Sequence, residues 1–173
     1  MSSVWPGATT TLSGILIGGA ITYVGQALNR RRESRRELYG DFAGECRVWF
    51  VSLLRVNYTV ENHWENDKRL PHWDRANDMK ATVFGLRTQV SLLATRPTIK
   101  AAELLERYLE SLDKKIYERE HRPQAVSPIS EDECKREFET PLKNFLDAAD
   151  NELRIFRRVR GGSSVSGGAG LSG

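Results

Sequence analysis

Apolar residues recur at steps of three and four along most of the chain, which is the spacing of one face of an α-helix. Four such series follow residue 37, and Pro71 marks the end of the first at the latest. The second covers about residues 73–94, the third begins at Pro97 and ends at His121-Arg122-Pro123, and the fourth follows Ser130. No alternation typical of a strand is long enough to compete, so the pattern predicts an all-α fold.

The predicted core positions of the first two helices are Leu38, Phe42, Cys46, Trp49, Leu53, Val56, Val60 and Trp64, then Ala76, Met79, Val83, Leu86, Val90 and Leu93. Those of the last two are Ala101, Leu105, Tyr108, Leu112 and Ile116, widened by Ala102, Leu104 and Leu109, then Cys134, Phe138, Leu142, Phe145, Ala149, Leu153 and Phe156. Each helix has one apolar face that it cannot bury alone, so short links between them favour an antiparallel bundle of about four helices.

Local signals set the expected ends of these helices. Pro97 suits a first helical turn, and Ser130 with Glu133 three residues later is a capping box. Pro141 is expected to kink the fourth helix or delay its start. Up-and-down order brings the arginine-rich end of that helix, residues 154–160, back beside the arginines of residues 30–36.

The N-terminal segment has a different pattern, because residues 4–29 contain no Asp, Glu, Lys, Arg or His. A helix from Gly7 to Leu28 measures roughly 33 Å, enough to cross the hydrocarbon core of a bilayer. The alternatives are a buried core helix and an export signal, but a cleaved signal has its positive charge before the apolar run. Here the arginines come after it, so we predict a single-pass transmembrane helix that precedes the bundle.

Five arginines follow this segment within seven positions: Arg30, Arg31, Arg32, Arg35 and Arg36. Positive residues next to a span remain in the cytoplasm, so the pattern predicts an inner or plasma membrane protein with its N-terminus outside. The same arginines are expected to contact the anionic inner leaflet. The predicted organisation is an anchor (1–29), a basic juxtamembrane segment (30–37), a cytoplasmic helical bundle (38–160) and a disordered Gly/Ser tail (161–173).

Small residues recur every four positions within the predicted span, at Thr10, Gly14, Gly18 and Thr22. Such a stripe lets two helix backbones approach closely in lipid, so it is a candidate site of homo-oligomerisation. The alternative is that glycine is simply frequent in membrane-spanning helices.

Composition points to no catalytic or cofactor chemistry. The chain has 173 residues, 39% of them hydrophobic and 28% charged, and its net charge of +3 comes from the arginine cluster, which argues against nucleic-acid binding. Two cysteines are too few for a disulfide framework.

His63 and His72 flank the first interhelical turn, but solvated histidines beside Trp64 and Trp73, with both tryptophans closing the bundle end, explain them better than a metal site. The carboxylates of Glu103, Glu106 and Glu110 are interpreted as a solvated face. We therefore expect no enzyme, metal or cofactor.

The stretch from Asn29 to Phe42, NRRRESRRELYGDF, after a Gly/Thr-rich span, resembles that of small uncharacterised bacterial and phage single-pass membrane proteins. The resemblance covers about residues 10–42 and implies a helical cytoplasmic domain after the arginines. The function expected is a membrane-tethered interaction or scaffold protein that holds a protein partner at the cytoplasmic face. The alternative is an oligomerising membrane effector of phage or host-defence type.

Overall fold

The computed structural model describes residues 8–124 and 126–161, with the side chains of residues 26, 29–124 and 126–155. Within these ranges the regular elements are four helices: α1 (Ala8–Glu61), α2 (Asn66–Leu93), α3 (Arg96–His121) and α4 (Glu131–Gly161). The all-α prediction is confirmed for this part of the chain. The chain divides into two compact units, residues 1–35 and 36–173, and the second contains the rest of α1 with α2, α3 and α4.

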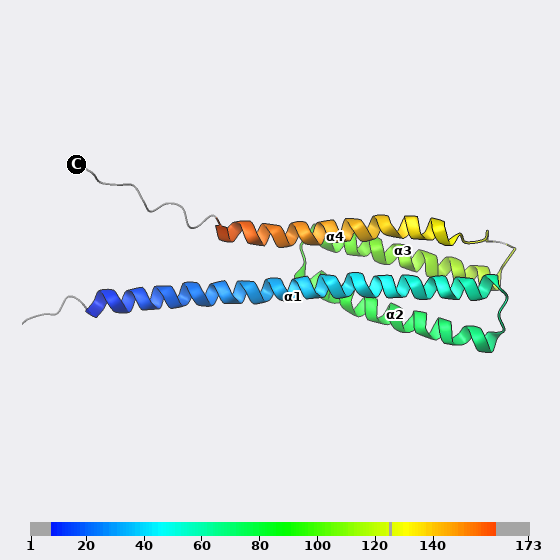
Figure 1. The fold of residues 1–173 in the computed structure, drawn as a ribbon, viewed down its shortest axis with the longest axis horizontal. Helices are drawn as coiled ribbons and strands as arrows, with labels where there is room; N and C mark the ends of the chain where they lie inside the picture. Colours follow the sequence, from blue (N-terminus) through cyan, green and yellow to red (C-terminus); the bar gives the residue numbers. More distant parts are fainter. Residues whose placement is uncertain (1–7, 125, 162–173) are drawn as a thin grey trace, which may run out of the picture. The chain divides into compact units, whose positions relative to one another are not determined.

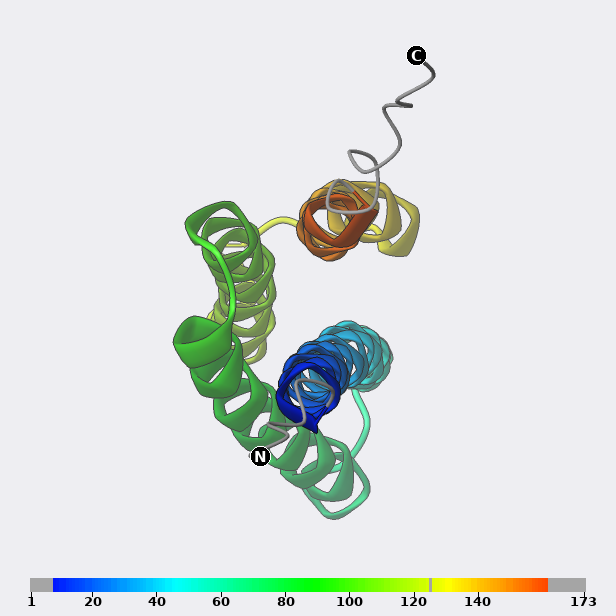
Figure 2. The same cartoon turned by 90° about the vertical axis from the view of Figure 1, so that its left-hand side faces the viewer.

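Consecutive helices of the second unit run in opposite directions (Figure 1). Figure 2 looks along them and shows α2, α3 and α4 following one another in an arc, with α1 alongside. Aromatic contacts join the first and last helices: the rings of Phe42 and Phe145 meet edge to face at 5.0 Å, and those of Phe50 and Phe138 stack at 4.2 Å. Four antiparallel helices therefore share one core in this unit.

Most of the predicted core positions are buried. The exceptions whose side chains are most exposed are Trp64 (39%), Leu93 (44%) and Leu104 (47%). Trp64 lies beyond the end of α1, Leu93 is the last residue of α2, and Leu104 is followed directly by the fully buried Leu105. Apolar spacing identified the core face of each helix but extended it too far at two helix ends and on one flank.

One expected boundary was wrong, and it lies at a proline. The second helix begins at Asn66 instead of about residue 73, so that Pro71 lies inside it. Proline removes one backbone hydrogen bond, whereas tertiary contacts hold these first turns: Arg69 Nε lies 3.0 Å from a carboxylate oxygen of Glu120, and Trp73 Nε1 donates to the same side chain at 2.8 Å. The fourth helix begins at Glu131, as the capping box predicts, so of the two expected effects of Pro141 the delayed start does not occur. The Ser130 cap is confirmed, since the backbone N–H of Glu133 donates to its hydroxyl.

A buried carboxylate, Glu152 of α4, ties three elements together at one end of the bundle. It accepts hydrogen bonds from Tyr39 Oη of α1 (2.8 Å), from the backbone N–H and hydroxyl of Thr95 (2.9 and 2.8 Å) and from Thr98 Oγ1 of α3 (2.7 Å). Tyr39 belongs to residues 29–42, the stretch that carries the resemblance. Within that stretch, Tyr39 is therefore a contact between α1 and α4 of the bundle. We call this the proximal end, because α1 enters the second unit there at Arg36.

The opposite, distal end contains the α1–α2 link and the connection between α3 and α4 (Figure 1). Arg154 lies two residues after Glu152 and is therefore at the proximal end with Arg36. For these two residues the expected return of α4 toward the start of the bundle is confirmed.

Among the residues that the structure describes, no helix combines the length and the apolar character needed to cross a bilayer. The side chains of residues 8–25, on which the predicted span depends, lie outside the described residues.

Candidate interaction groove

The end of α1 builds an aromatic surface through a Schellman motif. The backbone N–H of Trp64 donates to the carbonyl of Thr59 (3.0 Å), and that of His63 donates to the carbonyl of Val60 (3.2 Å). His63 has a φ of 53°, the left-handed conformation that this motif requires and that glycine usually supplies. The turn directs Trp64 back onto α1, where its ring meets Tyr58 edge to face at 6.0 Å.

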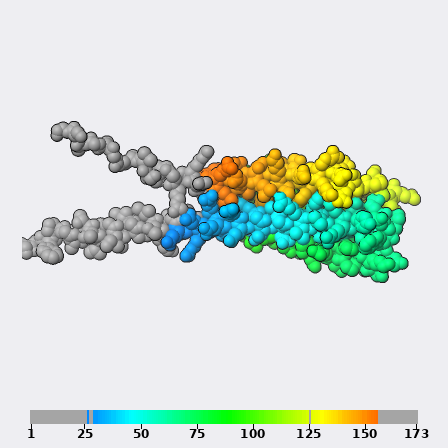
Figure 3. Space-filling model, viewed as in Figure 1, coloured from blue at the N-terminus to red at the C-terminus, as the bar shows by residue number. Residues whose placement is uncertain are grey.

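A groove of about 490 Å³ lies beside this turn. Its walls come from α1, from Trp64, from His72 of α2 and from Glu131 and Lys135 of α4. On the face drawn in Figure 3, α1 (cyan) forms the surface between α4 (yellow to orange) and α2 (green). Three apolar side chains of the groove remain substantially exposed: Val51 (46%), Tyr58 (58%) and Trp64 (39%). An exposed apolar cluster of this kind is typical of a protein interaction site.

The charges around the groove are unequal. Lys135 is paired with Glu131 one turn earlier in α4, at 2.7 Å. Arg55, between Val51 and Tyr58 on α1, is exposed and makes no ion pair or hydrogen bond with any described residue. The groove therefore presents one uncompensated positive charge within an apolar surface.

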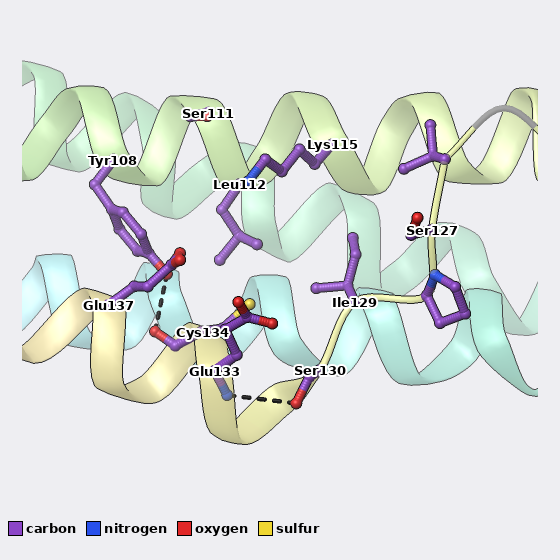
Figure 4. Close-up of a pocket in the computed structure, with 12 residues that line it drawn as sticks. Tyr108, Ser111, Leu112, Lys115, Ser127, Ile129, Ser130, Glu133, Cys134 and Glu137 are labelled. Carbon is purple, nitrogen blue, oxygen red and sulfur yellow. Dashed lines mark hydrogen bonds between the residues drawn. The ribbon is translucent and has the colours of Figure 1, made fainter.

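A second cavity, of about 290 Å³, lies between α3, the segment of residues 126–130 and the start of α4 (Figure 4). Tyr108 Oη donates to the carbonyl of Cys134 (2.8 Å), and Ser130 Oγ accepts from Glu133. Burial is the main cause that raises the pKa of the Cys134 thiol, and burial likewise raises the pKa of the Tyr108 phenol. Both groups remain protonated at neutral pH, so this cavity holds no activated nucleophile of these two types.

The carboxylate row on α3 differs from the expected solvated face. Glu106 is buried, with 6% of its surface exposed, and lies 2.9 Å from Nε of Arg87, which also pairs with Glu103 at 3.0 Å. Burial raises the pKa of Glu106, although the charge of Arg87 opposes the shift. The interpretation as a solvated face was therefore wrong for Glu106, because its position in the helix turns it toward Cys46 and the core. Burial, and after it the negative charge of Glu106, raise the pKa of the Cys46 thiol.

The two histidines have different surroundings. His63 is exposed in the turn, whereas His72 is partly buried and its ring lies 6.0 Å from that of Trp64. Trp73 packs against the core and donates to Glu120, but Trp64 lines the open groove, so the expectation that both tryptophans close the bundle end was wrong for Trp64. Among the described residues no three His, Cys, Asp or Glu side chains form a group able to hold a metal ion.

None of the five arginines predicted from sequence to contact lipid is among the residues that line this groove. Arg30, Arg31, Arg32 and Arg36 are exposed and Arg35 is partly buried. The side chains of Thr10, Gly14, Gly18 and Thr22 lie outside the described residues.

The groove residues Val51, Arg55 and Tyr58 were missed because α1 carries two apolar series, and the stronger one forms the core. The weaker series, Val48, Val51 and Tyr58, follows the same helical spacing on another face. That second series was the available signal, since a surface helix of a bundle needs only one apolar stripe.

Comparison with known proteins adds no identity to this fold. No protein-family model, no curated protein and no solved structure matches the chain.

Proposed function

We propose that the chain is a membrane-tethered adaptor, in which residues 1–29 anchor the protein and the helical bundle holds a partner protein at the cytoplasmic face. The observation that carries this proposal is the apolar groove with exposed Tyr58 and Trp64 at the distal end of the bundle. From Arg36 to Tyr58, α1 advances about 33 Å at 1.5 Å per residue. The groove therefore lies at the end of the bundle opposite to the residue at which α1 enters it.

The sequence supports the tether. Uncharged residues 4–29 followed by five arginines are the pattern of a span whose basic side stays in the cytoplasm. Exposed Arg36 at the proximal end is suited to anionic headgroups, at roughly 1 kcal/mol for each well-placed charge.

The test is a photo-reactive residue at position 51, incorporated into the full chain in cells of its natural host. We expect one partner protein to cross-link there, and that partner to leave the membrane fraction when residues 1–29 are deleted. The matched control carries the same photo-reactive residue at Arg75, which is exposed on α2 outside the groove. Equal cross-linking at both positions, or a partner whose distribution ignores the deletion, would contradict the adaptor.

The second candidate function is an oligomerising membrane effector, favoured by the stripe of Thr10, Gly14, Gly18 and Thr22. Gly14→Leu with Gly18→Leu separates the two candidates, because leucine prevents close approach of the helix backbones. Effector action is abolished by this change, whereas tethering of a partner survives it.

A further inference from the structure

We infer that the groove beside α1 receives an acidic amphipathic helix of the partner protein. The inference rests on the proposed adaptor function and names the chemistry of what the adaptor holds. It is carried by the exposed apolar series of α1, by the aromatic end of the groove and by unpaired arginines on the same face.

The apolar series has the length and spacing of a helix-binding seam. Val48, Val51 and Tyr58 are 37%, 46% and 58% exposed, and half-buried Leu54 continues the series between them. From Val48 to Tyr58 the seam extends about 15 Å along α1. A partner helix of about ten residues, with apolar side chains at steps of three and four, matches that length.

The aromatic end of the groove is held by contacts within the chain. The rings of Tyr58 and Trp64 contact at 6.0 Å, those of Trp64 and His72 also at 6.0 Å, and the backbone of the turn fixes Trp64. Aromatic anchors held in place lose little conformational entropy on binding, which makes such residues frequent hot spots.

The charges select an acidic partner. Arg47 and Arg55 lie on the same face of α1 as the seam, both are exposed, and neither forms an ion pair with a described residue. Glu131, the acidic residue that lines the groove, is already paired with Lys135. Carboxylates that flank the apolar stripe of the partner helix would neutralise the two arginines.

A second copy of the chain fits less well than an acidic helix. If two copies met through the same seam about a two-fold axis parallel to α1, Arg47 and Arg55 would lie opposite their own equivalents. Such like-charge contacts oppose association.

The experiment uses the full chain in lipid nanodiscs as the target of a phage-displayed library of helix-biased peptides about 14 residues long. We expect the selected peptides to carry apolar residues at steps of three and four together with Asp or Glu. For a selected peptide, Tyr58→Ala weakens binding at least tenfold, as expected for an interface hot spot. Arg55→Glu weakens it comparably, and replacing the peptide's acidic residues by lysine restores part of the affinity for this variant.

Matched controls are Tyr117→Ala and Arg75→Glu, since Tyr117 is 54% exposed, Arg75 is also exposed, and neither lines the groove. Both controls should bind the peptides within twofold of the unchanged protein.

The inference is overturned when selected peptides are basic, when they are insensitive to Tyr58→Ala, or when a selection that succeeds on a control target yields no binder. Dimerisation that Tyr58→Ala abolishes would instead assign the groove to a second copy. Failure of the chain to enter nanodiscs contradicts the tether, whereas peptide binding to the lipid-free chain still tests the groove.

Discussion

Two buried carboxylates, Glu152 and Glu106, have opposite electrostatic surroundings. Burial raises the pKa of Glu152, but hydrogen bonds from the backbone of Thr95, the hydroxyls of Thr98 and Thr95 and the phenol of Tyr39 outweigh it and leave the pKa below its ordinary value. Glu106 has only Arg87 to offset its burial, and one of its oxygens has no hydrogen-bond partner among the described residues. Glu152 therefore stabilises the fold when ionised, whereas ionisation of Glu106 costs stability.

Glu152→Gln is expected to lower the free energy of unfolding by about 2–3 kcal/mol at pH 7, because it weakens several hydrogen bonds to a buried charge. The folded pKa is depressed, so this contribution is present above the ordinary glutamate value of about 4.3 and is lost as pH falls through the folded pKa. Urea unfolding at a series of pH values measures it. Glu139→Gln, at an exposed position of α4, is the control and should change little. A loss as large at pH 3 as at pH 7 would refute this account.

Glu106→Gln should have the opposite sign and raise the free energy of unfolding by about 1 kcal/mol at pH 7, because the neutral amide avoids the burial cost of the carboxylate while Arg87 keeps its ion pair with Glu103. The folded pKa of Glu106 is raised, so the protonated side chain contributes to the stability of the fold. That contribution is fully present below the unfolded pKa and is lost as pH rises through the folded pKa. The advantage of the variant should therefore increase from acidic to neutral pH in the same urea measurement. A variant less stable than the unchanged protein at pH 7 would show that the ion pair with Arg87 outweighs the burial cost.

At the scale of the element, the end of α1 joins local backbone chemistry to the candidate site. The Schellman turn satisfies the last carbonyls of the helix and places Trp64 on Tyr58, at the cost of holding His63 at φ 53°. A residue other than glycine in this conformation loses roughly 1 kcal/mol. The groove thus depends on a conformation that the side chain of His63 itself opposes.

His63→Gly is expected to stabilise the protein by about 1 kcal/mol, because glycine adopts the left-handed conformation without steric cost. Ala81→Gly, at an exposed position within α2, is the control and should destabilise by a similar amount through lost helix propensity. Thermal unfolding followed by circular dichroism compares the two. Destabilisation by both substitutions would indicate that the imidazole makes a contact that outweighs the strain.

The sequence was sufficient to predict the four-helix, all-α fold, since apolar spacing follows directly from the face that each helix buries. The position of Pro71 gave the wrong start for α2, because an ion pair from Arg69 and a hydrogen bond from Trp73 to Glu120 of α3 compensate for one lost backbone hydrogen bond. Sequence alone also missed the groove, because it assembles Val51, Trp64 and Lys135 from three different parts of the chain. Burial of Glu106 depends on the packing of α2 against α3, which spacing of charges along one helix does not reveal.

At the scale of the whole molecule, the proposed function separates two tasks along the chain. Residues 1–36 carry the uncharged segment and the arginine cluster, and the bundle carries its exposed apolar groove at the end opposite to Arg36. Glu152 joins α1, α3 and α4 at the proximal end, opposite to the groove. In this account residues 1–29 hold the chain at the membrane, and the bundle offers a docking surface to the partner protein.

The measurement that tests this account most directly is extraction of cell membranes with alkaline carbonate, which removes peripheral proteins and retains spanning ones. The full chain should remain in the membrane pellet, and a variant without residues 1–29 should be recovered in the supernatant. Release of the full chain into the supernatant would contradict the tether and with it the central claim.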